Sequence, residues 1–199
     1  MTGNEKLHID GNALPNATIA QFWAWSSSNL LSNTLRGIFG EYIVASALGI
    51  NMKEPRKEWQ TCDFDYEGYK IEVKTSAYLQ EWNLTHETMK ISNISFRIAP
   101  TKALDSFTGS YEKESKRHAD VYVFCVLTCQ DAEKIDPLNM NQWDFYVVST
   151  QNLHLHLHLH LPEQKSISLT SLAKIPEVKN VKFGLLKENV DKALGIIAK

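Results

Sequence analysis

The chain has 199 residues, the length of one domain that can bury a hydrophobic core without disulfides. Its hydrophobic fraction of 43% and charged fraction of 22% exclude a disordered chain, a collagen-like chain and a coiled coil. A net charge of -2 argues against a protein that coats nucleic acid with its whole surface, and it leaves a local basic patch open.

Targeting signals and the use of cysteine indicate the cellular compartment in which we expect the protein. No apolar run reaches the roughly 18 residues that span a bilayer, and the first residues lack the layout of a signal peptide. We therefore expect a cytoplasmic protein with no membrane partner. Cys62, Cys125 and Cys129 contain no Cys-x-x-Cys pair, so we expect reduced and mostly buried thiols.

The first expected element is a helical region over about residues 22–48, with Ser32 or Asn33 capping its second part. Its end is apolar nearly all round, which is typical of a buried helix. Gly49 is expected to end the helix, and a basic loop follows over residues 51–60.

Strand patterns come next. Residues 61–66 and 69–76 alternate with a period of two and are separated only by Glu-Gly, which predicts a hairpin. Residues 91–98 alternate again and predict a third strand. The polar stretch 101–117 is consistent with a helix and loops.

The second half completes an α/β pattern. Residues 119–128 are almost unbroken apolar sequence, as expected of a central strand that is covered on both faces. Residues 143–150 predict another strand and residues 185–197 a closing amphipathic helix. The order predicts a single α/β domain over residues 1–199, with a mixed central sheet flanked by helices.

The predicted hairpin brings two carboxylates together. With a two-residue loop Tyr66 faces Tyr69, and counting outward places Asp63 opposite Glu72. Like charges on directly opposed residues, with Cβ atoms about 5 Å apart, are destabilising unless something positive lies between them. A divalent cation is the natural occupant, because magnesium is held by one or two carboxylates with waters and phosphates.

Counting outward from the hairpin loop also places the neighbouring charged residues. Lys74 projects from the same face as Glu72, where its ammonium could orient or deprotonate a metal-bound water. Asp65 lies opposite Lys70 and has an ordinary ion-pair explanation. Asp63 is therefore the predicted ligand.

A further carboxylate lies on the buried helix. Glu41 is the only charge in residues 37–48, and a buried carboxylate needs a cation, a donor network or a polar cleft. Gly37 and Gly40 would let this helix approach the sheet closely. The alternative is a glutamate near the helix end that reaches solvent.

Together, Asp63, the stretch Ile71-Glu72-Val73-Lys74 and the preceding helix with Glu41 resemble the PD-(D/E)XK superfamily of metal-dependent nucleases. Residues 33–41 and 71–82 are similar to a group of bacterial proteins without an assigned biological role. Cys62 stands where a proline often precedes the aspartate.

The resemblance covers about residues 20–150 and leaves residues 151–199 as a C-terminal extension. It implies a restriction-endonuclease-like fold, an αβββαβ core with a mixed central sheet flanked by helices. It also implies magnesium, with manganese as a substitute, bound by Asp63, Glu72 and the backbone carbonyl of Val73.

The implied reaction is hydrolysis of a phosphodiester, most directly in DNA. By resemblance, Lys74 would position the attacking water, and Glu41 would contact a metal-bound water or a second ion. Gln80 is a further candidate near the same edge. The leading hypothesis is a magnesium-dependent endonuclease, for which a homodimer is one arrangement that cuts two strands.

Two other functions stay open: a non-catalytic nucleic-acid-binding or assembly module with the same fold, and a metal-binding protein that uses the Leu-His repeat at 153–161. If that repeat is extended, its four histidines share one face and could hold zinc, nickel or copper. The other interpretation is a half-buried strand or a surface loop with a short repeat. The histidines are His154, His156, His158 and His160.

Basic and aromatic side chains could add nucleic-acid contacts. One basic cluster lies at 113–118 and another at 174–187, and each could contact phosphates or form a solvated face. Arg97, on the polar face of the third strand, is the most interesting single cation. The tryptophans could stack on bases or be buried.

Overall fold

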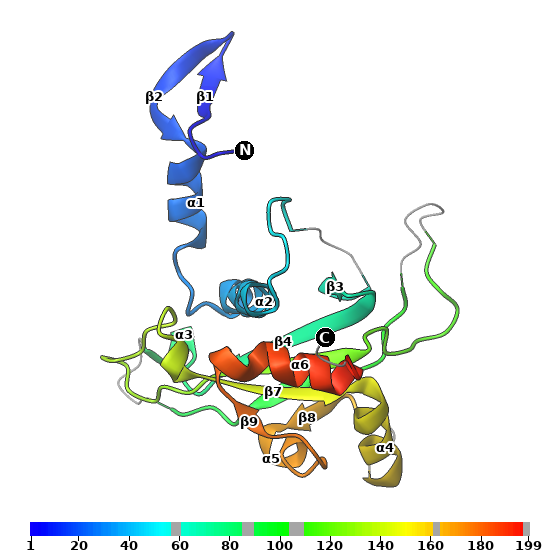
Figure 1. The fold of residues 1–199 in the computed structure, drawn as a ribbon. Coiled ribbons are helices and arrows are strands. Elements are labelled where there is room, and N and C mark those ends of the chain that lie inside the picture. The colour runs from blue at the N-terminus through cyan, green and yellow to red at the C-terminus, as the bar shows by residue number, and fades with distance from the viewer. Residues whose placement is uncertain (57–60, 85–89, 104–109, 161–163, 197–199) are drawn as a thin grey trace.

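The computed structural model describes the chain except for residues 57–60, 85–89, 104–109, 161–163 and 197–199 (Figure 1). Its centre is a five-stranded sheet with the order β3-β4-β6-β7-β9. Strands β4 and β6 are parallel and the other neighbours are antiparallel, which confirms the predicted mixed α/β sheet. The strands are β3 Phe64–Tyr66, β4 Tyr69–Ala77, β6 Val121–Leu127, β7 Trp143–Ser149 and β9 Asn180–Val181.

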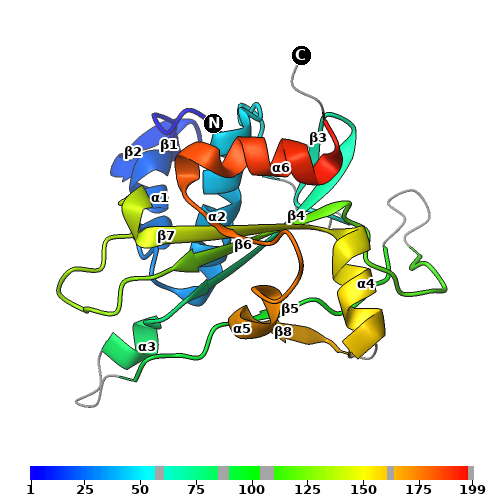
Figure 2. The ribbon, with the colours of Figure 1, turned by 60° about the horizontal axis from the view of Figure 1, so that its bottom comes forward.

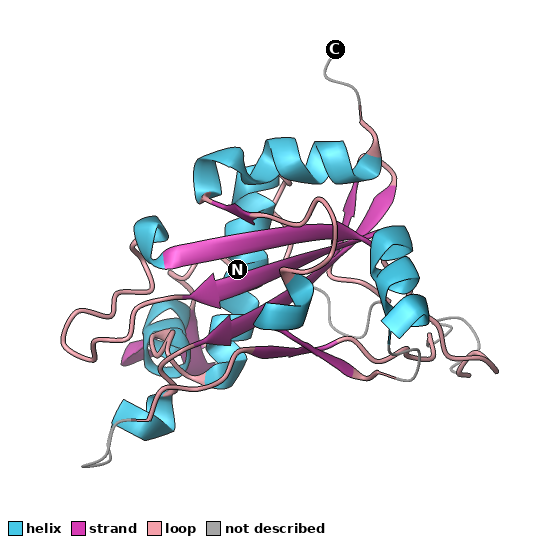
Figure 3. Ribbon diagram, turned by 90° about the horizontal axis from the view of Figure 1, so that it is seen from below, coloured by secondary structure: helices cyan, strands magenta, loops and turns pink. Residues whose placement is uncertain are grey.

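Helices cover both faces of this sheet (Figure 2). Helices α2 (Asn33–Leu48) and α6 (Leu186–Leu194) pack on the face that carries Ile71 and Val73. The opposite face is covered by α4 (Thr150–His160), α5 (Leu169–Leu172) and a small sheet. That small sheet pairs β5 (Ser95–Arg97) with β8 (Ser166–Ser168). Figure 3 shows the helices in cyan on both sides of the strands in magenta. The remaining elements are α3 Glu81–Leu84 and the short 3₁₀ helices Met140–Gln142 and Phe183–Leu185.

Strand β6 is the centre of the core, as predicted. All seven of its residues are buried, because side chains on alternate positions enter the two hydrophobic clusters on either face. The cysteines are free thiols, with Cys62 and Cys125 buried and Cys129 partly buried. No helix in the described ranges has the length and apolar character needed to cross a membrane.

The predicted helical region consists of two helices. Helix α1 (Ile19–Ser27) ends before α2, and the Ser32 hydroxyl accepts a hydrogen bond from the Leu35 N–H at 3.3 Å. Of the two predicted caps, Ser32 and Asn33, Ser32 is therefore the one that caps α2. Gly49 ends α2 with a φ of 71°, the left-handed conformation that favours glycine.

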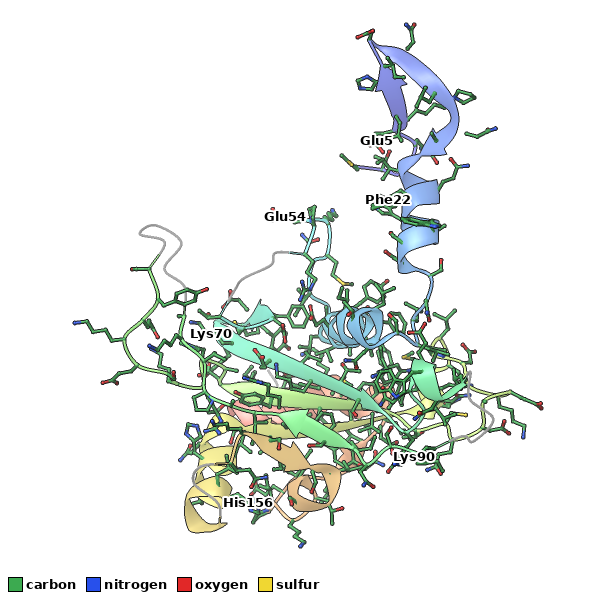
Figure 4. The ribbon with its side chains drawn as sticks, turned by 180° about the vertical axis from the view of Figure 1, so that it is seen from behind. Glu5, Phe22, Glu54, Lys70, Lys90 and His156 are labelled. Atoms are coloured by element: carbon green, nitrogen blue, oxygen red, sulfur yellow. The ribbon has the colours of Figure 1, made fainter. Side chains whose placement is uncertain are left out.

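An N-terminal arm, residues 1–27, stands away from the sheet (Figures 1 and 4). It consists of the hairpin β1 (Lys6–Ile9) and β2 (Asn12–Thr18) followed by α1. None of the residues of α1 is buried, and Trp25 is 85% exposed. The arm therefore adds no side chain of α1 to the hydrophobic core.

The third predicted strand is shorter than expected and lies outside the central sheet. Only Ser95–Arg97 is a strand, and it pairs with β8. Ile94, Phe96 and Ile98 are buried against the face of β6 that lies opposite α2. The helix expected within 101–117 is absent from residues 101–103 and 110–117, which are described and include only an isolated bridge between Thr101 and Lys116.

Residues 153–160 of the Leu-His repeat lie in helix α4, so the prediction of an extended strand or a surface loop is wrong, and residue 161 lies outside the described residues. Helical spacing buries Leu153 and Leu157, four residues apart, and leaves Leu155 59% exposed. His154 is exposed and His156 is partly buried, whereas the side chains of 158–160 lie outside the description. The histidines therefore do not form the single face expected of a strand.

Candidate active site

The hairpin has the predicted register. Strands β3 and β4 pair Tyr66 with Tyr69 and Phe64 with Ile71. The two loop residues have φ values of 52° and 84°, which fit a type I′ turn. The paired residues end at Phe64 and Ile71, so Asp63 lies just before the ladder, and the predicted direct pairing of Asp63 with Glu72 is not among the strand pairs.

Asp63 immediately precedes β3 and is held by β4 through two hydrogen bonds. Its backbone N–H donates to the Ile71 carbonyl at 3.0 Å, and its Oδ2 accepts from the Val73 N–H at 2.7 Å. Burial raises the pKa of the Asp63 carboxyl to about 7, and the negative charges of Glu72 and Glu41 add to this shift. Both glutamates therefore act electrostatically on the Asp63 carboxyl.

Glu72 and Lys74 lie on the same face of β4, as predicted. The Lys74 ammonium forms an ion pair with the Glu72 carboxylate. Both side chains are partly exposed, at 32% for Lys74 and 20% for Glu72. Ile71 and Val73 point the other way into the core. The hairpin therefore presents two carboxylates and one ammonium at the edge of the sheet.

Glu41 comes from α2, which approaches β4 closely. A Cβ atom added at Gly40 would collide with the Thr75 hydroxyl, so glycine allows this approach. Glu41 is 14% exposed and accepts two hydrogen bonds from Arg56, at 2.5 and 2.9 Å. The Glu41 carboxylate has an arginine partner and is not simply solvated.

A cavity of about 400 Å³ opens beside this helix and is shared by the carboxylates of Glu41 and Asp63. The loop after α2 forms its other wall, and Figure 4 shows Glu54 on that loop. The cavity lining also contains apolar side chains, including Ile38, Tyr42 and Met52. The site thus adjoins an accessible and partly apolar hollow.

Gln80 lies beyond the end of β4 in a different network. Its Oε1 accepts from the buried Arg36 guanidinium at 2.9 Å, and its Nε2 donates to the Ala77 carbonyl at 2.8 Å. Both atoms of the amide are therefore occupied within the protein. The structure does not bring Gln80 into the set of Asp63, Glu72 and Lys74, and its catalytic role stays a prediction.

The donor set of the hairpin fits a hard cation. Asp63, Glu72 and the carbonyl of Val73 offer oxygen atoms, and magnesium typically takes one or two carboxylates and completes its shell with water and phosphate. Burial first, and then the negative charge of Glu72, raises the pKa of Asp63, and a bound cation would counter both effects. Among residues with a described position, no group of three or more His, Cys, Asp or Glu could hold a metal ion.

On the other side of Glu72, a smaller cavity of about 70 Å³ contains cations that sequence reasoning did not join to the site. Glu72 and Lys74 line it together with Arg97, Arg117 and Tyr122. Tyr122 is the neighbour of Glu72 across the parallel β4–β6 pair, and burial raises its pKa to about 12. Tyr122 could not be predicted from the sequence, because its place beside Glu72 depends on that long-range pairing. A signal did exist for Arg56, the partner of Glu41, because it lies in the basic loop that follows the helix.

The family comparison covers this whole arrangement. A family model described as bacteriophage T4 endonuclease IV matches residues 24–157, about two thirds of the chain. The matched stretch contains α2, the hairpin, β6 and β7. No curated protein and no solved structure matches the chain. The chain belongs to the bacteriophage T4 endonuclease IV family, and its functional class is that of a nuclease.

Proposed function

We propose that the chain is a metal-dependent endonuclease of the PD-(D/E)XK type that hydrolyses phosphodiester bonds in DNA. The observation that supports this proposal is the hairpin end, where the Asp63 carboxylate is held by the Val73 N–H, feels the charge of Glu72, and Glu72 pairs with Lys74. The hairpin lies inside the stretch that matches the nuclease family.

Asp63, Glu72 and the Val73 carbonyl would hold magnesium, for which manganese would substitute. The Val73 N–H fixes one oxygen of Asp63, so the carboxylate is oriented before any ion arrives. When bound, the cation supplies Lewis acidity to the phosphoryl oxygen and lowers the pKa of a water. It would also offset the repulsion that raises the pKa of Asp63.

Lys74 holds the attacking water in this proposal. Its ammonium has three donors, and the ion pair with Glu72 uses one of them. The others are free to orient a water or to stabilise charge on the phosphate. Glu41 is a second water acceptor, and it becomes available when Arg56 turns away.

The test is cleavage of supercoiled plasmid, single-stranded DNA, branched DNA and RNA, each with magnesium, with manganese and with chelator. The wild type is compared with Glu72→Ala and Lys74→Ala. Lys70→Ala is the matched control, because Lys70 is an exposed lysine on the same face of β4, four residues earlier. Circular dichroism and melting temperature check that each variant folds.

We expect metal-dependent cleavage by the wild type and by Lys70→Ala, and a loss of about 100-fold or more in both site variants. Cleavage of RNA alone would move the substrate from DNA to RNA. A folded wild type that cleaves nothing would contradict the proposal and favour a non-catalytic module that binds nucleic acid.

A further inference from the structure

The small cavity beside Glu72 and Lys74 is rich in positive charge. Among the described residues that line it, Glu72 is the sole carboxylate, and Lys74 already pairs with it. Arg97 and Arg117 therefore add two cations that this carboxylate does not balance.

Neither arginine has an acidic partner in the described part of the chain. Arg117 donates from Nε to the Ile98 carbonyl at 2.8 Å and from Nη2 to the Gln164 carbonyl at 3.4 Å. These uncharged oxygens fix the guanidinium plane and leave its charge unneutralised. No described carboxylate lies within ion-pair distance of Arg97, which is exposed at the end of β5.

The surroundings make an anion favourable here. Burial lowers the pKa of Arg117, because its charge has lost part of its hydration. A partly desolvated cation gains more from an anion than a fully hydrated cation does. His118 is already engaged with the Thr101 carbonyl at 2.9 Å, and it closes one wall of the cavity.

We propose that Arg97 and Arg117 form a phosphate-binding subsite that holds a backbone phosphate of the nucleic acid next to the scissile one. This inference rests on the proposed function. Guanidinium groups bind phosphate oxygens in a bidentate manner. The cavity volume of about 70 Å³ suits one small anion and not a base, so the subsite positions the strand without reading its sequence.

The position of the subsite explains its role in cleavage. Glu72 and Lys74 line the small cavity, whereas Asp63 and Glu41 line the large one, so the proposed catalytic set lies between the two. A phosphate held by the arginines would fix the strand relative to the Lys74 ammonium. The arginines are thus positioning residues and do not touch the reacting atoms.

The test separates binding from cleavage. The affinity of a labelled mixed-sequence DNA oligonucleotide is measured by fluorescence anisotropy in chelator over a series of salt concentrations. The proteins are the wild type, Arg97→Gln, Arg117→Lys and the control Lys90→Gln, an exposed cation outside the cavity and outside both basic clusters. Arg117→Lys keeps the positive charge and removes the planar guanidinium group that binds two phosphate oxygens. Its melting temperature reports any loss of fold.

Arg97→Gln should reduce the slope of log affinity against log salt by about 0.7–0.9, the value of one phosphate contact. Its KM in magnesium-dependent cleavage should rise about tenfold with kcat nearly unchanged, because uniform binding is lost. Arg117→Lys should shift KM in the same direction, and Lys90→Gln should leave both readouts unchanged.

Two outcomes distinguish the subsite from the enzyme. Cleavage with a slope and KM that Arg97→Gln does not change would overturn the subsite and leave the nuclease proposal standing. Binding that weakens in Arg97→Gln without any cleavage by the wild type would keep the subsite and overturn the nuclease proposal. Equal slope losses in Arg97→Gln and Lys90→Gln would show diffuse attraction and would also overturn the subsite.

Discussion

Asp63 is a half-buried carboxyl group whose ionisation is opposed by its surroundings. Burial and the charges of Glu72 and Glu41 raise its pKa to about 7, whereas the Val73 N–H and Lys74 act in the opposite direction. Ionisation of the Asp63 carboxyl is therefore unfavourable in the metal-free protein and becomes favourable when a cation binds.

This raised pKa predicts a pH dependence of stability. Unfolded Asp63 ionises near pH 3.8, and the folded carboxyl stays protonated up to about pH 7. Because the folded state then binds more protons, this group lowers the unfolding free energy as pH rises from about 4 to 7 and adds no further change above that range. Asparagine does not ionise, so Asp63→Asn should keep the unfolding free energy, on the order of 2–4 kcal/mol, that the wild type loses over this pH range.

The measurement is urea unfolding of the metal-free wild type and Asp63→Asn at several pH values. The difference between the two proteins should grow over that window. Saturating magnesium at pH 7.5 should raise the melting temperature of the wild type and leave that of Asp63→Asn nearly unchanged. Parallel pH profiles of the two proteins would contradict the assigned environment of Asp63.

Gly40 predicts a packing effect with a control on the same helix. A Cβ at position 40 would meet the Thr75 side chain, so Gly40→Ala should cost about 1–3 kcal/mol of unfolding free energy. Gly37→Ala meets nothing within 4 Å and should be neutral or stabilising by up to about 1 kcal/mol. Thermal unfolding compares the two variants, and equal effects would contradict the close approach of α2 to β4.

At the scale of elements, a local turn signal predicts the β3–β4 hairpin, whereas no local signal predicts which distant strands pair. The β3–β4 register follows from a two-residue loop, and together with the hydrogen bonds of Asp63 to Ile71 and Val73 it places Asp63 beside β4. The placement of β5 depends on Arg97 pairing with Ser166, 69 residues later, and no local pattern shows this. The contribution of Arg117 and Tyr122 to the site likewise depends on distant strands.

Helix α4 shows why a strict alternation can mislead. A Leu-His repeat has a period of two, yet a helix needs only Leu153 and Leu157 on the core side. Both leucines are buried against the sheet, and this tertiary contact decides the conformation. The repeat itself is compatible with either structure.

Two leucine variants distinguish these structures. Leu157→Ala should cost about 2–5 kcal/mol of unfolding free energy, because Leu157 is only 3% exposed. Leu155→Ala should cost about 0.5 kcal/mol or less, because that side chain is 59% exposed. A strand would give similar losses at both positions, since both leucines would share one face, and chemical denaturation would detect this.

At the scale of the whole molecule, the N-terminal arm exposes several large apolar side chains. Leu7, Ile9, Phe22 and Trp25 are each more than half exposed. Exposed apolar clusters of this kind mark sites of association. A homodimer, which would bring two sites to two strands, could therefore use the arm as its contact.

This interface predicts a change in assembly without a change in fold. Phe22→Ser with Trp25→Ser should alter the unfolding free energy of the monomer by about 0.5 kcal/mol or less, because α1 has no buried residue. Sedimentation velocity should show a wild-type dimer that dissociates in this double variant. Tyr111→Ser, which changes another exposed aromatic residue, is the control. A wild type that stays monomeric at all concentrations would exclude the arm as a contact between copies.

The closure of the central sheet by α6 has a consequence for synthesis on the ribosome. The proposed catalytic residues lie between positions 41 and 74, but the sheet face beneath them is sealed by Leu186 and Val190. At 5–20 residues per second, the ribosome needs on the order of ten seconds to reach α6 after releasing the hairpin. The nascent chain therefore carries the proposed catalytic residues while its core is still open to chaperones, and we expect any cleavage to wait until α6 has been made and has packed on the sheet.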